Sequence, residues 1–191
     1  MIVGFAGLAR SGKDTAAGLL MEHGFRKYAL ATPLKKACRE VFGLSDDQIH
    51  GAAKDVVDPR YGVAPRHIFQ LLGTDCVRGI APDAFVDRFS EWYGANAPGR
   101  VVVPDVRFPN EVDAIHALGG KVYRIRRGPD VADTLNHASE RPSELDVDGV
   151  IRNDGTMEYL RAVLFSVVPV KSRVADRDAS LNGHVYRKFG F

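Results

Sequence analysis

Short runs of apolar residues alternate along the chain with segments in which apolar residues recur every three or four positions. The apolar runs predict strands at 2–6, 25–30, 101–103, 122–125 and 150–151. The periodic segments predict helices at 15–23, 34–42, 65–72, 83–94, 109–118 and 156–167. Strands that alternate with helices indicate a three-layer α/β domain around a mostly parallel sheet.

The same spacing assigns residues to the core. Three consecutive valines, Val101–Val103, predict a strand that is buried on both faces, as in a parallel sheet. Phe85, Val86, Phe89 and Trp92 form a helical stripe that we interpret as core rather than as a stacking surface. Other positions expected to face inward are Leu34, Ala37, Cys38, Val41, Phe42, Ile68, Leu71, Leu72, Val112, Ile115, Leu118, Leu160, Val163, Leu164 and Val167. Thr156 is the expected N-cap of the last helix.

Three stretches lack regular patterning. Residues 45–65 are polar and interrupted by glycine and proline, so we expect an irregular segment with a short helix near 46–50. Residues 128–148 are rich in charge, and residues 170–191 form a basic tail. The expected organisation is one domain over 1–169, with an insertion at about 44–96, a second irregular segment at about 128–148, and the tail 170–191.

Composition limits the class of protein but does not define a function. The 191 residues are 45% hydrophobic and 26% charged, and the net charge of +2 is too small to indicate nucleic-acid binding. No run of 18 apolar residues and no secretory signal is visible, so we expect a cytoplasmic protein without membrane association. Cys38 and Cys76 are expected to be buried free thiols, and the histidines lack ligand spacing for zinc.

The stretch Gly7–Thr15 contains the clearest chemical signal. It follows the first predicted strand, opens the first predicted helix, and has the spacing Gly-x4-Gly-Lys of a phosphate-binding loop. Backbone N–H groups, the helix dipole and Lys13 would all favour phosphate there. The general pattern has Ser or Thr after the lysine, whereas here Asp14 precedes Thr15. The alternative is a glycine-rich turn with a solvated lysine, but the strand before and the helix after favour a phosphate loop.

Polar residues follow several of the predicted strands. Lys13, Asp105, Arg127 and Asn153 all do so, and the carboxyl ends of parallel strands meet at one edge, so we expect these residues to share a rim. Asp105 could hold magnesium directly or through water, and Thr15 could offer its hydroxyl. The alternative for Asp105 is a turn or N-cap aspartate. Arg107, two residues further on, could bind phosphate.

Cations and carboxylates in the irregular segments suggest phosphoryl transfer rather than phosphate binding alone. Singly, each cation is typical of a solvated surface, but together they fit a lid that closes and excludes water. These cations are Lys35, Arg66, Arg78, Arg126, Arg127 and Arg141. No general base stands out, which weakly favours a phosphate monoester as acceptor, because that group is already mostly ionised at neutral pH. Asp75 or Asp105 could nevertheless serve as a base.

Several short stretches together resemble the deoxynucleoside monophosphate kinase family known from tailed bacteriophages and their prophages. They are residues 11–15 (SGKDT), 31–35 (ATPLK), 70–75 (QLLGTD), 103–107 (VPDVR), 111–114 (EVDA), 137–140 (HASE) and 153–155 (NDG). Their order and approximate spacing agree with the family over about residues 2–167. The Gly-Lys-Asp-Thr form is usual in this family, which turns the departure at Asp14 into support.

The resemblance implies an enzyme that uses ATP and Mg²⁺ to phosphorylate a deoxynucleoside monophosphate to the diphosphate. It implies a P-loop nucleoside monophosphate kinase-like fold with a five-stranded parallel sheet, a helical acceptor-binding part at about 44–96, and a lid at about 128–148. It also implies small nucleotides as the binding partners, no stable nucleic-acid binding, and the cytoplasm of a bacterial host cell. A homodimer is left open.

The resemblance also assigns residue roles. The ATP-binding residues would be Leu8, Ala9, Arg10, Ser11, Gly12, Lys13, Asp14 and Thr15, with Asn153 near the adenine. The catalytic residues would be Lys13, Asp105, Arg107 and Arg127, with Thr15 and Asp105 at the magnesium ion. The acceptor side would comprise Lys35, Arg66, Gln70, Asp75 and Arg78, together with His137 and Glu140 of the lid.

Two other functions stay open on the sequence. Animal phosphomevalonate kinase shares the Gly-Lys-Asp and Asp-x-Arg features, so a kinase of another small phosphate ester is one alternative. A nucleotide-gated ATPase that controls assembly is the other. Residues 45–65 match the family poorly, so the accepted bases are not predicted.

Overall fold

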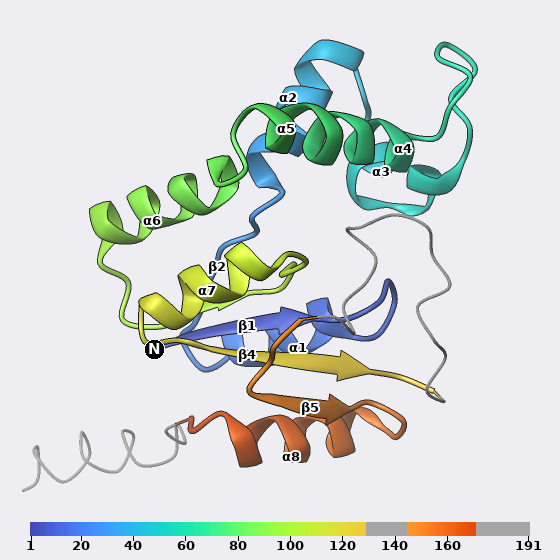
Figure 1. Cartoon of the computed structure of the whole chain (residues 1–191). Coiled ribbons are helices and arrows are strands. Elements are labelled where there is room, and N and C mark those ends of the chain that lie inside the picture. The colour runs from blue at the N-terminus through green and yellow to red at the C-terminus, as the bar shows by residue number, and fades with distance from the viewer. Residues whose placement is uncertain (129–144, 171–191) are drawn as a thin grey trace, which may run out of the picture.

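The computed structural model describes residues 1–128 and 145–170. Within these residues, five parallel strands form one sheet in the order β2-β3-β1-β4-β5 (Figure 1). The strands are β1 (Ile2–Ala6), β2 (Arg26–Lys27), β3 (Val101–Val103), β4 (Lys121–Arg126) and β5 (Gly149–Arg152). The predicted five-stranded parallel sheet is therefore confirmed. No helix in the described part of the chain has the length and apolar character needed to cross a membrane.

Helices cover both faces of the sheet, which makes the predicted three layers. Helices α1 (Lys13–Met21) and α8 (Met157–Val167) pack on one face, against Val3 and Phe5 of β1. Helices α6 (Ala84–Asn96) and α7 (Pro109–Ala117) cover the other face, which receives Ile2 and Ala6. Alternate residues of β1 thus serve opposite layers, as the pleat requires.

The predicted strand at 25–30 is wrong in its length. Only Arg26 and Lys27 lie in β2, although the N–H of Tyr28 still donates to Val102 O at 3.0 Å. The next N–H groups leave the ladder, because those of Leu30 and Ala31 donate to the Asp105 carboxylate instead. A long-range side chain thus replaces the partner that a longer strand would have used.

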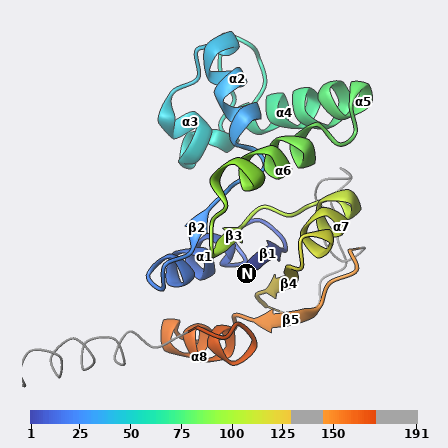
Figure 2. The ribbon, with the colours of Figure 1, turned by 90° about the vertical axis from the view of Figure 1, so that its left-hand side faces the viewer.

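A separate group of helices stands above the sheet in both views (Figures 1 and 2). It contains α2 (Thr32–Phe42), α3 (Asp46–His50), the 3₁₀ turn η1 (Ala52–Asp55), α4 (Pro65–Gln70), the π-helix η2 (Leu71–Val77) and α5 (Arg78–Ile80). Its own buried cluster is small: Cys38, Leu44, Ile49 and Ile68. We call α2 to α5 the helical part, and the remainder of the described chain the sheet half.

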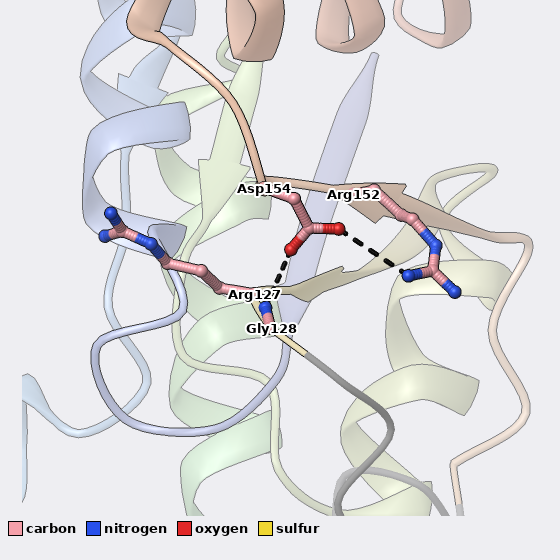
Figure 3. Close-up of a pocket in the computed structure, with 4 residues that line it drawn as sticks. All are labelled: Arg127, Gly128, Arg152 and Asp154. Carbon is pink, nitrogen blue, oxygen red and sulfur yellow. Dashed lines mark hydrogen bonds and ion pairs between the residues drawn. The ribbon is translucent and has the colours of Figure 1, made fainter.

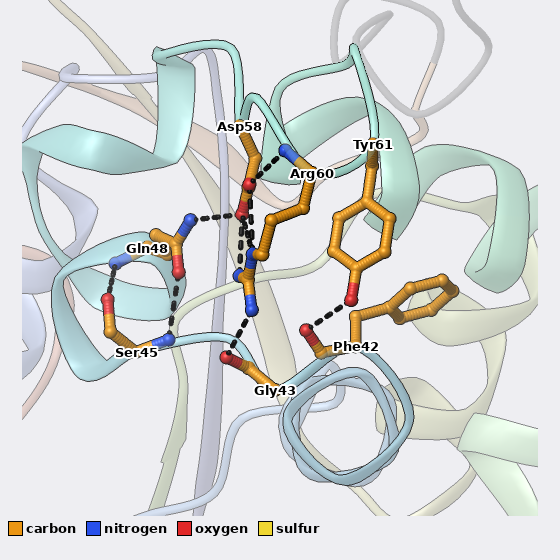
Figure 4. Close-up of polar contacts among 7 residues, drawn as sticks. All are labelled: Phe42, Gly43, Ser45, Gln48, Asp58, Arg60 and Tyr61. Atoms are coloured by element: carbon orange, nitrogen blue, oxygen red, sulfur yellow. Dashed lines mark hydrogen bonds and ion pairs between the residues drawn. The ribbon is translucent and has the colours of Figure 1, made fainter.

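Polar contacts order the segment that the sequence predicts to be irregular (Figure 4). The buried Asp58 carboxylate accepts hydrogen bonds from Gln48 Nε2 at 2.7 Å and from the backbone N–H and the guanidinium of Arg60. These hydrogen bonds, those from Arg60 foremost, hold the pKa of Asp58 well below its usual range. Ser45 caps α3 by accepting from Gln48 N at 3.3 Å, so the predicted short helix at 46–50 is confirmed.

Some residues expected to face inward are exposed. They are Ala37, Val41, Leu71, Leu118 and Val167, and Cys76 is exposed as well. Leu118 and Val167 lie at helix ends, where the covering layer stops. Leu71 and Cys76 lie in the π-helix, whose wider turns depart from the 3.6-residue period that the prediction assumes. Ala37 and Val41 are exposed on α2, whereas Cys38 is buried as predicted.

Candidate active site

The loop Gly7–Gly12 connects β1 to α1 and requires glycine at both ends. Gly7 and Gly12 have φ values of 137° and 106°, in the left-handed region that favours glycine. A Cβ atom on Gly7 would lie 2.3 Å from Ile125 O, and one on Gly12 would lie 2.2 Å from Asn153 Nδ2. The loop is therefore fitted tightly between β4 and the residue that follows β5. Its N–H groups and the start of α1 form a ready site for an anion.

Lys13 begins α1 and folds back over this loop. Its Nζ donates to the carbonyl oxygens of Gly7 at 2.7 Å and Leu8 at 2.5 Å. Burial, followed by repulsion from Arg107, lowers the pKa of Lys13 to about 8. The ammonium group is thus poorly solvated and held only by carbonyl dipoles, an arrangement that a phosphate oxygen would improve. The Oγ of Ser11 beside it is buried and has no hydrogen-bond partner among the described residues.

Asp105 follows β3 and contacts the entrance to the helical part. Its Oδ1 accepts from Leu30 N at 2.9 Å, and its Oδ2 accepts from Ala31 N at 3.0 Å. Burial lowers the pKa of Lys35, as it does that of Lys13, and the charge of Asp105 opposes both shifts, so the carboxylate lies within electrostatic reach of both amines. Asp105 therefore connects the end of β3 to the start of α2 and acts electrostatically on Lys13 of the phosphate loop.

Glu111 is a buried carboxylate that the sequence reasoning did not include among the site residues. Its Oε2 accepts from the backbone N–H of Arg107 at 2.6 Å and of Phe108 at 3.1 Å, and its Oε1 accepts from Arg78. Burial raises the pKa of Glu111, while the Arg78 charge and these N–H groups oppose that shift. The sequence held a signal, because an acid two residues after Pro109 occupies the N3 position of a helix.

Lys54, on η1, is a second residue that the sequence reasoning missed. Burial, followed by the charges of Arg66, Lys35 and Arg107, lowers the pKa of Lys54 to about 8. Arg107 and Lys54 in turn lower the pKa of Lys13. Five cations from five separate segments thus act on one another electrostatically near the phosphate loop: Lys13, Lys35, Lys54, Arg66 and Arg107. No local pattern in the polar segment 45–65 distinguishes Lys54, so only the tertiary structure could have identified it.

The acceptor-side residues that the sequence predicts fall into different surroundings. Arg66 forms an ion pair with Asp55, and Lys35 Nζ lies 3.5 Å from His50 Nδ1. Gln70 is half-buried at the end of α4, and Asp75 is exposed on η2. The prediction that these residues bind substrate stays a prediction.

The Arg78 guanidinium is already engaged. It is packed on the ring of Phe108 at 4.0 Å and that of Phe85 at 4.8 Å, and it pairs with Glu111. Its side chain is 13% exposed, so most of it faces protein. A substrate-binding role for Arg78 stays a prediction, whereas its contact with Glu111 is a feature of the structure.

An open hollow of about 480 Å³ lies at the ends of β4 and β5 (Figure 3). Arg127, Gly128, Arg152 and Asp154 line it. Asp154 accepts from Gly128 N at 2.7 Å and pairs with Arg152 at 3.5 Å, while the Arg127 side chain points away from that pair. Nearby Asn153 is buried, and its Nδ2 donates to Ser11 O at 2.9 Å.

The expected rim is present at the carboxyl edge of the sheet. Lys13, Asp105, Arg127 and Asn153 all follow parallel strands, and Asn153 directly contacts the phosphate loop. Asn153 thus holds the loop in place, and its predicted contact with adenine stays a prediction. The predicted lid residues His137 and Glu140, and Arg141 with them, lie outside the described residues.

A parallel sheet with a glycine loop leading into α1, and a lysine at the first turn, defines a P-loop phosphotransferase. Sequence comparison assigns the family. The sequence profile of the deoxynucleotide monophosphate kinase family matches residues 45–164. A protein of Acanthamoeba polyphaga mimivirus, described as "Putative deoxynucleotide monophosphate kinase", is 38% identical, with 91% of this chain and 99% of that protein covered. The chain belongs to the deoxynucleotide monophosphate kinase family and is a nucleotide kinase.

Three solved structures are similar to the chain. TT1252 from Thermus thermophilus is 19% identical, with a TM-score of 0.44 and coverage of 87% of this chain and 95% of that chain. Dephospho-CoA kinase from Campylobacter jejuni is 14% identical, with a TM-score of 0.47 and coverage of 87% and 95%. Shikimate kinase from Aquifex aeolicus is 14% identical, with a TM-score of 0.44 and coverage of 96% and 97%. All three TM-scores lie below 0.5.

Proposed function

We propose that the protein transfers the γ-phosphate of ATP to the 5′-phosphate of a deoxynucleoside monophosphate, giving ADP and the diphosphate. Membership of the family supports this reaction. The single structural observation behind the proposal is the convergence of Lys13, Lys35, Lys54, Arg66 and Arg107 beside the phosphate loop. Two nucleotides with their phosphates face to face need such a concentration of positive charge.

The donor would lie along the rim of the sheet. Its β- and γ-phosphates would accept hydrogen bonds from the loop Gly7–Gly12 and the start of α1. Lys13 would then exchange the carbonyl oxygens of Gly7 and Leu8 for phosphate oxygens, which raises its pKa and keeps it charged. The base of ATP would occupy the hollow beside Arg127 and Arg152, at the far end of the same edge.

The acceptor would lie between the sheet half and the helical part. Lys35, Lys54 and Arg66 would hold its 5′-phosphate, with Gln70 and Asp75 further along the same helices. The charge of Arg107 contributes to the lowered pKa of both Lys13 and Lys54, so Arg107 is within electrostatic reach of both groups of cations. It would neutralise the oxygens of the phosphoryl group as that group moves from donor to acceptor.

This chemistry requires no general base. A phosphate monoester has a second pKa of about 6, so the attacking oxygen is already ionised at neutral pH. The protein therefore has to align the two phosphates and exclude water, with Arg127 as a further cation at the donor side of the rim. His137 and Glu140 are proposed to act with the segment around them in covering the site.

The residues present fit a magnesium ion held mainly by phosphate and water oxygens. Thr15 is exposed in the first turn of α1, and each Asp105 oxygen accepts one N–H and keeps a further lone pair. The described residues contain no group of three or more His, Cys, Asp or Glu that could enclose a metal ion. Thr15 and Asp105 are the residues that would hold the ion, which would supply positive charge against the phosphate oxygens.

A panel of acceptors tests the proposal. Wild-type protein with ATP and Mg²⁺ is incubated with each of the four deoxynucleoside monophosphates, with phosphomevalonate, with dephospho-coenzyme A, or with no acceptor. We expect ADP and a matching deoxynucleoside diphosphate in equal amounts from at least one of the four, and much slower ADP release without acceptor. Product only from another phosphate ester, or release of ADP at one rate regardless of acceptor, would contradict the proposal.

A further inference from the structure

A buried ion pair connects α5 in the helical part to α7 in the sheet half. Arg78 belongs to α5 and Glu111 to the first turn of α7, 33 residues further along the chain. The Glu111 side chain is 2% exposed and that of Arg78 is 13% exposed. Both charges are therefore largely removed from water, which is costly unless each finds several partners.

Each charge does find several partners. The aromatic rings of Phe108 and Phe85 lie 4.0 and 4.8 Å from the Arg78 guanidinium. Glu111 accepts from that guanidinium with one oxygen and from two backbone N–H groups with the other. One of those N–H groups belongs to Arg107, the cation that the proposed function places at the transferred phosphoryl group.

Neighbouring hydrogen bonds also join the end of the helical part to α7. Arg78 Nη1 donates to Pro82 O at 3.3 Å, and Asn110 Nδ2 donates to Pro82 O at 3.1 Å and to Asp83 Oδ1 at 2.8 Å. The segment that leaves the helical part is thus attached to the first turn of α7. Any shift of α5 would act on the backbone that positions Arg107.

We propose that Glu111 and Arg78 are positioning residues that set Arg107 relative to the helices that hold the acceptor. The proposal rests on the proposed function, in which those helices bind the acceptor phosphate and Arg107 contacts the transferred group. Neither residue touches a reacting atom. Their pairing makes the position of Arg107 depend on the position of α5, so acceptor binding and the alignment of Arg107 occur together.

The surroundings of the Glu111 side chain require a carboxylate. One oxygen faces a guanidinium and the other faces two N–H groups, so every neighbour is a donor. The amide of Glu111→Gln offers a single acceptor oxygen, and its NH₂ group would face donors. Glu111→Gln keeps the volume of the side chain but loses its hydrogen bonds either to Arg78 or to the two backbone N–H groups.

The test compares four variants with the wild type. Glu111→Gln and Arg78→Met each remove one charge, and the double variant removes both and so leaves no unpaired buried charge. The matched control is the double variant Arg88→Met/Glu91→Gln, which removes an exposed ion pair on α6. The measurements are the Kd for ATP, kcat and KM for the acceptor, the thermal midpoint, and amide hydrogen exchange at Arg107 and Phe108.

We expect kcat/KM for the acceptor to fall at least tenfold in both single variants, while the Kd for ATP changes less than twofold. The double variant should recover most of the thermal stability and keep the tenfold loss, because the two parts are no longer connected. The control should change no constant by more than twofold. A double variant that recovers both stability and kcat/KM would show that the pair only stabilises the fold, and would overturn the proposal.

Amide exchange tests the connection without any substrate. Arg78→Met should speed exchange of the Arg107 and Phe108 N–H groups at least tenfold. The Arg107 group is the decisive one, because Arg78 also packs directly on the Phe108 ring, whereas Glu111 joins it to the Arg107 N–H. Unchanged exchange at both groups would overturn the proposal even if activity fell. A wild type that phosphorylates none of the four deoxynucleoside monophosphates would instead refute the proposed function, and leave the exchange result to decide whether the connection exists.

Discussion

The sheet half and the helical part are stabilised by different interactions. In the sheet half, two large apolar clusters lie on the two faces of the sheet and include every residue of β3. The helical part has a buried apolar cluster of four residues, Cys38, Leu44, Ile49 and Ile68. It relies as well on polar contacts around Asp58 and on ion pairs such as Arg39–Asp46 and Arg66–Asp55. The proposed donor site thus lies on a rigid base, and the proposed acceptor site on an adjustable one.

This difference has a physical consequence for motion. Exposed ion pairs contribute about 0–1 kcal/mol each, whereas a fully buried Leu or Ile contributes about 1.5–3 kcal/mol. The helical part should therefore open locally at a lower free energy than the sheet half. Closure of a kinase around two nucleotides needs one part that moves and one that does not.

The largest expected effect is the loss of Lys13 from the rigid half. Lys13→Ala removes the cation at the phosphate loop, and transfer should fall by roughly a thousandfold, because the charge that develops on the phosphate oxygens loses its stabilising partner there. Its thermal midpoint should not fall, since the poorly solvated ammonium does not stabilise the free protein. Lys121→Ala, at an exposed position of β4, is the matched control and should keep full activity. Near-normal turnover of Lys13→Ala would contradict our assignment of Lys13.

A pair of core truncations tests whether the sheet half and the helical part differ in local stability. Leu164→Ala and Ile49→Ala each delete a buried side chain of similar size and should each cost about 2–5 kcal/mol locally. Leu164→Ala should lower the free energy of global unfolding and speed exchange throughout the sheet.

Ile49→Ala should speed exchange mainly within 43–72 and leave the amides of β1 and β4 protected. The measurement is amide hydrogen exchange of both variants and the wild type. Equal effects on the two parts in both variants would show that the molecule opens as one unit.

The pH dependence of acceptor use should reflect the crowded cations. With ATP saturating, Lys13 is already paired, so Lys54 with its pKa of about 8 should dominate. Loss of its proton above that pH removes a phosphate-binding charge, and kcat/KM for the acceptor should fall about tenfold per pH unit. Lys54→Arg keeps its charge and should flatten the profile up to pH 9. A wild-type profile without a fall between pH 8 and 9 would contradict this role of Lys54.

The smallest expected effect concerns Asp14. Its carboxylate is 84% exposed and pairs with Lys27 on β2 at 2.8 Å, away from the carbonyl oxygens that hold Lys13. Asp14→Asn should change the free energy of unfolding by less than about 1 kcal/mol and kcat by less than threefold. Urea unfolding and steady-state rates measure both. A hundredfold loss of kcat would instead place Asp14 among the residues that act on phosphate or metal.

Local signals in the sequence predicted the sheet half well. The valine run at 101–103, the glycine loop and the Thr156 cap each depend on residues that are close in sequence, and the structure contains all three. The helical part was less predictable, because the π-helix changed the phase at Leu71.

The two residues that the sequence reasoning missed depend on contacts between distant segments. Lys54 is surrounded by cations from three other segments, and Glu111 meets Arg78 only in the folded chain. Nothing in the local sequence distinguishes a buried ion pair from two solvated charges. The sequence therefore predicted where a phosphate would bind, but not how the helical part is joined to that site.

Transfer of labelled phosphate tests the central claim most directly. Wild-type protein and Lys13→Ala are mixed with γ-labelled ATP, Mg²⁺ and the four deoxynucleoside monophosphates, and the products are separated. We predict that the wild type moves the label into a deoxynucleoside diphosphate, with little label in inorganic phosphate. Lys13→Ala should leave the label in ATP. Label that appears only in inorganic phosphate, with no labelled diphosphate from any of the four acceptors, would contradict the proposed kinase activity.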